Sequence, residues 1–245
     1  MTQINEGLAK DGMAWFSNFQ TAGKGQRGKA WVGNPDENIA LTIAFESPTI
    51  FQKQPFLFNA LISLEIRSFL QNIINESILE REGKENNAQT EQIDKNVHIK
   101  WPNDLWVNDR KAGGVLIENK YRGNNWNWAV VGIGINVNQI LFSEDLKMAT
   151  SLKQITQKNY NPEYLARRLH QKIAESIIQI DDSAFKNLMS EYNYHLYKRG
   201  SVVKFKKENT FFESTVVGVN EKGFLLTQDE MEREFQFGEI EWCLQ

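Results

Sequence analysis

Large apolar residues recur at helical spacing in two long stretches of the chain. Residues 55–79 carry one at every third or fourth position, which predicts a long helix that covers a core. Asn161–Pro162 precedes a second stripe of the same kind, and proline suits the first turn of a helix. The pattern also predicts a helix over about 183–197 and the tail of one over 3–10, stopped near Gly12.

Elsewhere the apolar residues fall in short runs that predict strands. These runs are residues 13–19, 39–43, 97–101, 105–107, 115–118 and 126–138. From Arg199 the period changes to two, and short strands alternate with turns. We therefore predict an α+β chain of two domains. Residues 1–197 would form a mixed sheet with flanking helices, and residues 198–245 a small SH3-like β-barrel. The polar residues 80–96 predict an exposed, mobile loop.

Composition excludes several classes of protein. A net charge of −3 argues against a general nucleic-acid binder. The single cysteine, Cys243, leaves no disulfide framework and fits a reducing cytosol. No apolar run is long enough for a membrane helix, the N-terminus does not read as a signal peptide, and the three histidines lack metal-ligand spacing. We expect a cytoplasmic protein that binds neither membrane nor DNA.

The stretch from Lys100 to Asn119, KWPNDLWVNDRKAGGVLIEN, predicts a strand, a polar turn and a hairpin. Lys111 follows the hairpin turn, and Asn103 and Asp104 lie in the turn before it. Gly113–Gly114 precedes an apolar strand, so something should approach the backbone closely there. These residues alone fit an ordinary hairpin with a surface lysine equally well.

Residues 20–29, QTAGKGQRGK, form a glycine-rich basic loop. Its letters match a dinucleotide fingerprint, but a strand follows where that motif needs a helix. They also match most of a P-loop, but Ala30 stands where a serine or threonine belongs. The exposed backbone N–H groups and positive charges still suit an anion, although a flexible basic loop is the simpler interpretation.

Gly132 and Gly134 alternate along a predicted strand, in the sequence GIGINVN. Alternating glycines leave one face of a strand bare, which makes room for a flat ligand or another backbone. A twisted or bulged strand explains the same pattern.

The three motifs QTAGKGQRGK, KWPNDLWVNDRKAGGVLIE and GIGINVN, followed by a small β-domain, occur in one order. In this order the chain resembles biotin protein ligases from about residue 12 to its C-terminus. The resemblance implies a class II synthetase-like fold. It implies an enzyme that makes biotinyl-5′-AMP from biotin and ATP with Mg²⁺ and transfers biotin to a lysine of a biotin carboxyl carrier protein. It also allows a homodimer through the central sheet.

The resemblance assigns roles residue by residue. Lys111 would be the catalytic residue and contact the biotin carboxylate, and Asp104 would be on the magnesium side. Biotin would be held by Gln20, Gly23, Lys24, Gly25, Gln26, Lys111, Gly114, Leu116, Gly132 and Gly134. ATP and the adenylate would be held by Arg27, Lys29, Trp31, Asn103, Asp104 and Asn136.

The sequence departs from the family pattern in two places. Gln26 stands where the family's loop often has arginine, which removes a charged fork for phosphate. Only nineteen residues precede Gln20, so we expect the Ser-Thr-Asn segment and the DNA-binding domain of some members to be absent. Lipoate ligases and octanoyltransferases share the fold, and a non-catalytic biotin- or acyl-carrier-binding protein is a further alternative.

Overall fold

The computed structural model describes residues 1–28, 30–82 and 96–244. Its largest element is a six-stranded sheet in which all neighbouring strands pair antiparallel. In spatial order the strands are β1 (Met13–Phe16), β4 (Asn38–Glu46), β8 (Asn125–Asn136), β7 (Arg110–Arg122), β6 (Asp104–Val107) and β5 (Val97–Lys100). The predicted α+β fold with flanking helices is confirmed, and its sheet is antiparallel rather than mixed. The reason is that β5 to β8 form a meander of consecutive hairpins, which can only pair antiparallel.

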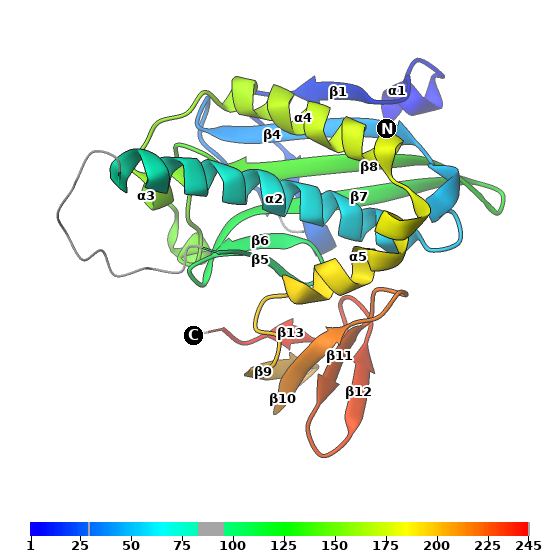
Figure 1. The fold of residues 1–245 in the computed structure, drawn as a ribbon, viewed down its shortest axis with the longest axis vertical. Helices are drawn as coiled ribbons and strands as arrows, with labels where there is room; N and C mark the ends of the chain where they lie inside the picture. Colours follow the sequence, from blue (N-terminus) through cyan, green and yellow to red (C-terminus); the bar gives the residue numbers. More distant parts are fainter. Residues whose placement is uncertain (29, 83–95, 245) are drawn as a thin grey trace.

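The main helices cover one face of this sheet, as Figure 1 shows. They are α2 (Pro55–Glu82), α4 (Pro162–Gln179) and α5 (Asp182–Tyr194), with the short α3 (Leu152–Thr156) nearby. The helices predicted over 55–79, after Asn161 and over 183–197 are confirmed, although α5 ends three residues early. Asn161 caps α4 by accepting a hydrogen bond from the Tyr164 N–H at 3.0 Å.

The helix predicted over 3–10 is mostly wrong. Only α1 (Thr2–Asn5) is helical, and Gly7 follows it at φ +70°. A left-handed glycine next to a helix end stops the helix, because the backbone cannot continue the right-handed turn there. The described residues also contain three 3₁₀ turns, at Gln26–Gly28, Thr49–Phe51 and Glu144–Leu146.

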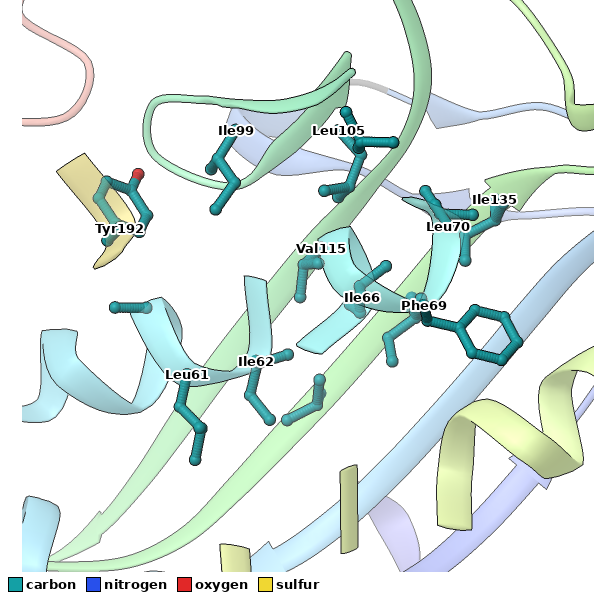
Figure 2. Packing of buried hydrophobic residues seen from close by; sticks show 14 of the residues in the cluster. Leu61, Ile62, Ile66, Phe69, Leu70, Ile99, Leu105, Val115, Ile135 and Tyr192 are labelled. Atoms are coloured by element: carbon teal, nitrogen blue, oxygen red, sulfur yellow. The ribbon is translucent and has the colours of Figure 1, made fainter. Parts of the chain in front are cut away.

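The core lies between α2 and the sheet. Figure 2 shows Ile62, Ile66 and Leu70 of α2 pointing toward Val115 and Ile135 of the sheet. These side chains are almost wholly removed from water. Full burial of one such side chain stabilises the fold by roughly 1.5–3 kcal/mol, so this layer holds the sheet rigidly against the helices.

The C-terminal residues form a separate five-stranded antiparallel sheet. Its order is β12 (Glu232–Phe235), β11 (Leu225–Gln228), β10 (Thr210–Val219), β9 (Val202–Lys207) and β13 (Glu241–Trp242). The predicted small β-unit is confirmed, but its barrel is not closed, because among the described residues β13 pairs only with β9.

The small sheet packs against the larger part rather than standing apart. The Trp101 indole N–H donates to the Gly223 carbonyl at 2.9 Å, and the ring of Phe56 lies against Gly223. One continuous hydrophobic cluster includes residues of both parts. The domain boundary at residue 198 stays a prediction.

The predicted loop over 80–96 lies mostly outside the described residues, and its first three positions belong to α2. No helix in the described ranges combines the length and the apolar character that crossing a membrane requires.

Candidate active site

A tight hairpin turn places Lys111. Asn108 and Asp109, at φ 49° and 58°, connect β6 to β7, and positive φ at both central positions is typical of a type I′ turn. The Lys111 N–H donates to the Met148 carbonyl at 2.6 Å, and its carbonyl accepts from the Thr150 N–H at 2.8 Å. The backbone of Lys111 is thereby held on both sides.

The Lys111 ammonium pairs with the Asp104 carboxylate at 2.7 Å, with both side chains about a quarter to a third exposed. The pair lies against Gly114. A Cβ at Gly114 would come within 2.9 Å of Asp104 Oδ1 and 3.3 Å of Lys111 Nζ. The close approach predicted at this glycine is confirmed, and it is the ion pair that approaches. At Gly113 the approaching group is instead the Gly134 carbonyl of the neighbouring strand.

Small residues line the sheet face that the helices leave uncovered. The register aligns two rows across the strands. The first row is Ala40, Gly134, Gly114 and Asp104, and the second is Thr42, Gly132 and Leu116. Their neighbours along the strands, such as Leu41, Ile133 and Val115, are buried on the helix side. Because successive side chains alternate between faces, the glycines leave a bare strip beside Lys111.

The glycine-rich loop folds back over this strip. Strands β2 (Gly23–Lys24) and β3 (Ala30–Trp31) pair antiparallel and form the base of the loop. The Trp31 indole lies on Gly134, since a Cβ there would be 2.5 Å from Trp31 Cε2. The Gln20 side chain lies beside Gly23, because a Cβ added to Gly23 would be 2.8 Å from Gln20 Oε1. Lys24 is exposed, while Gly25 is partly buried.

Gln26 connects the loop to the central motif. Its side-chain amide donates to Asn103 Oδ1 and, at 3.2 Å, to the Val115 carbonyl. The structure therefore brings together seven of the predicted positions directly: Gln26 with Asn103, Trp31 with Gly134, and Lys111 with Asp104 and Gly114. The side chain of Arg27 and all of Lys29 lie outside the described residues.

Asn136 has a supporting position. It is buried, and its amide donates to the Thr150 carbonyl at 2.9 Å. Thr150 is also the residue whose N–H donates to the Lys111 carbonyl. Asn136 thus braces the segment beside Lys111. Its predicted contact with the adenylate stays a prediction.

Sequence reasoning missed several groups that border the site. Ala40 and Thr42 enter it only through the pairing of β4 with β8. Asn59 of α2 donates to the Pro102 carbonyl at 3.2 Å and accepts from the Asn103 amide at 3.4 Å. A polar residue inside the apolar stripe of α2 was the available signal for Asn59.

Tyr192 of α5 supports the same turn from the core. Its hydroxyl donates to the Pro102 carbonyl at 2.7 Å. Complete burial, and then the nearby Asp104 carboxylate, hold the pKa of Tyr192 well above its usual value. The phenol therefore stays protonated and remains a hydrogen-bond donor.

The described residues contain no group of three or more His, Cys, Asp or Glu side chains that could hold a metal ion by themselves. Asp104 offers one carboxylate at the edge of the strip. Magnesium usually binds through one or two carboxylates together with substrate phosphates, so a single carboxylate fits an ion that arrives with a nucleotide.

Comparison with known proteins identifies the family. A sequence model of the biotin/lipoate A/B protein ligase family matches residues 1–136, more than half of the chain. The chain belongs to this family. The resemblance inferred from the three motifs is thereby confirmed.

Individual members of the biotin/lipoate ligase family resemble the chain to different extents. The bifunctional ligase/repressor BirA of Escherichia coli is 31% identical over 131 residues, 54% of this chain and 35% of that protein. BirA of Bacillus subtilis is 23% identical over 223 residues, 90% of this chain and 62% of that protein. The chain therefore spans less than two thirds of the length of these relatives.

The fold also matches solved structures of the family. Biotin protein ligase from Aquifex aeolicus in complex with biotin and ATP has a TM-score of 0.71 at 24% identity, covering 96% of this chain and 90% of that one. At this identity the likeness establishes the shared fold.

Proposed function

We propose that this protein is a biotin–protein ligase. It forms biotinyl-5′-AMP from biotin and ATP and transfers the biotinyl group to one lysine of a biotin carboxyl carrier domain. The observation that carries the proposal is the position of Lys111, whose ammonium lies beside a bare glycine strip under a folded basic loop. The names of the family relatives support biotin as the acid.

In the first step an oxygen of the biotin carboxylate attacks the α-phosphorus of ATP, and pyrophosphate leaves. Two anions must meet, so the site needs fixed positive charge. Lys111 supplies it, and its backbone is held by Met148 and Thr150. Asp104 keeps the ammonium in place until the substrate carboxylate competes for it. The strip of Gly114, Gly132 and Gly134 accommodates the substrate against the sheet.

The loop protects the product of this step. Biotinyl-AMP is a mixed anhydride that water hydrolyses, so the site must exclude water while it waits for the carrier. The loop is attached over the strip through two of its described residues, Gln26 and Trp31. Trp31 would cover the adenylate once substrate takes its place over Gly134.

Magnesium would be held at Asp104 together with the phosphates of ATP, where it supplies charge neutralisation. With Asp104 engaged in this way, the Lys111 ammonium would be available to the substrate carboxylate. Asn103, next to Asp104, keeps the turn in place through its carbonyl, which accepts from the Val115 N–H at 3.1 Å.

In the second step the amine of a carrier lysine attacks the acyl carbon, and AMP leaves. Residues 198–245 would assist ATP use and carrier docking without supplying reacting groups. A homodimer through the central sheet would use β1, which among the described residues pairs only with β4. The opposite edge is occupied, because the Ile99 N–H donates to the His195 carbonyl at 2.9 Å.

The test is pyrophosphate release from ATP with biotin, lipoate or octanoate as the acid. We expect release with biotin, and we expect Lys111→Ala to lower its rate about a hundredfold or more while the protein stays folded. Lys120→Ala, on the same strand, is the matched control and should keep the wild-type rate. Release with lipoate or octanoate but not with biotin would identify a lipoate or octanoate ligase of the same family. No release with any acid, or a wild-type rate in Lys111→Ala, would refute the proposal.

A further inference from the structure

A chain of side-chain amides connects helix α2 to the glycine-rich loop. It begins at the Pro102 carbonyl, which accepts from Asn59 Nδ2 at 3.2 Å. Asn59 Oδ1 accepts from Asn103 Nδ2 at 3.4 Å, and Asn103 Oδ1 accepts from Gln26 Nε2. Gln26 Nε2 also donates to the Val115 carbonyl at 3.2 Å. The chain thus begins and ends on backbone carbonyls.

The two carbonyls determine the orientation of every amide between them. A carbonyl can only accept, so Asn59 must turn its nitrogen toward Pro102 and its oxygen toward Asn103. Asn103 then turns its nitrogen toward Asn59 and its oxygen toward the loop. Gln26 must present its nitrogen to both Asn103 and Val115. The same orientation follows from either end, so the hydrogen bonds support one another.

The surroundings hold this arrangement in place. Asn103 is only 4% exposed, so a reversed amide would leave a buried donor facing the Gln26 nitrogen. The Pro102 carbonyl is also fixed by the hydroxyl of the fully buried Tyr192. Asn59 stands on the long helix α2, whose apolar residues are packed into the core.

We propose that Asn59 is a positioning residue, which orients Asn103 and through it holds the loop closed on the sheet by Gln26 before any substrate binds. The role in the reaction rests on the proposed ligase function, whereas the closed loop of the free protein does not. Because Gln26 is uncharged, this attachment is insensitive to salt. A loop already attached by Gln26 costs less further ordering when substrate arrives, and Trp31 is the part that has to leave its place over Gly134.

Trypsin measures the loop directly in the full-length free protein. Lys24 and Arg27 provide cleavage sites within it, and cleavage tracks the population of the open loop when opening and closing are fast. We expect Gln26→Met to be cut there about tenfold faster than wild type, because methionine cannot donate to either acceptor. The fragments are identified by mass.

Two substitutions of Asn59 isolate its positioning role. Asn59→Leu removes the acceptor toward Asn103, and we expect cleavage about fivefold faster. Asn59→Asp keeps that acceptor but loses the donor to the Pro102 carbonyl, so we expect its cleavage rate to lie between those of wild type and Asn59→Leu. Asn75→Ala is the matched control, since Asn75 is an exposed amide on the same helix whose partner among the described residues is Gln71. It should be cut at the wild-type rate.

The kinetic readout separates positioning from a general loss of structure. In Asn59→Leu we expect KM for biotin to rise by no more than the factor by which trypsin cleavage accelerates, while kcat stays at the wild-type value. Equal cleavage of Gln26→Met and wild type would overturn the closed loop. Equal behaviour of Asn59→Leu and Asn59→Asp would overturn the role of Asn59. If trypsin cleavage follows these expectations but the wild-type protein releases no pyrophosphate, the ligase function is refuted and the role of Asn59 in holding the loop stands.

Discussion

Replacing Gly134 by alanine tests whether Trp31 must lie over the bare strip. The added Cβ would be 2.5, 2.6 and 2.8 Å from three atoms of the indole. Carbon atoms in ordinary contact are about 3.5–4.0 Å apart, so the ring must move by roughly 1 Å. The loop carries Trp31, whereas β8 is held between two strands, so the loop is the part that moves.

A displacement of this size is large for catalysis and small for folding. A misplacement of about 1 Å can lower a rate by about a hundredfold. Alanine in a strand is itself favoured over glycine by roughly 0.5–1 kcal/mol, which offsets part of the lost contact. We therefore expect kcat/KM for biotin-dependent pyrophosphate release to fall about a hundredfold, while the melting temperature changes by less than about 4 °C.

Gly132→Ala provides the matched control for the position of the loop. Gly132 is on the same face of the same strand, but the nearest atom to its added Cβ is the Leu116 carbonyl oxygen at 3.5 Å. The indole N–H resonance of Trp31, assigned with Trp31→Phe, should shift in Gly134→Ala and stay in place in Gly132→Ala. An unchanged resonance and a wild-type rate in Gly134→Ala would refute the reasoning.

Two further predictions concern the junction of the two sheets and the pH dependence of stability. Gly223→Ala should lower the free energy of unfolding by roughly 2 kcal/mol in urea titrations, because Gly223 has φ +83° and an added Cβ would be 2.4 Å from the Phe56 ring. Gly123→Ala, at φ +62° with open space around it, should cost only about 1 kcal/mol, and equal losses would exclude the Phe56 contact as a cause. Burial, followed by Arg67 and His98, lowers the pKa of His195 from 6.5 to about 4, so between these values the unfolded chain binds more protons and stability falls as pH falls. Urea midpoints of His195→Gln should show a smaller fall over this window, and parallel curves for variant and wild type would contradict the assignment.

The sequence by itself determined the local features of the protein. The apolar period of residues 55–79 predicted α2, because a helix must present one continuous stripe to a core. The Asn-Asp turn before Lys111 predicted the hairpin, since both residues tolerate positive φ. Alternating Gly132 and Gly134 predicted a bare strand face in the same way. These features depend on residues that are neighbours along the chain.

Only the tertiary structure decided what meets at the site. The sequence showed that a face was bare but not that Trp31 covers it, and it showed Gln26 as a departure without revealing its partners Asn103 and Val115. The antiparallel order of the sheet likewise depends on which strands pair. Such contacts join residues far apart in the chain, and their choice is made by packing and by the need to satisfy buried donors and acceptors. No periodicity along the sequence encodes that choice.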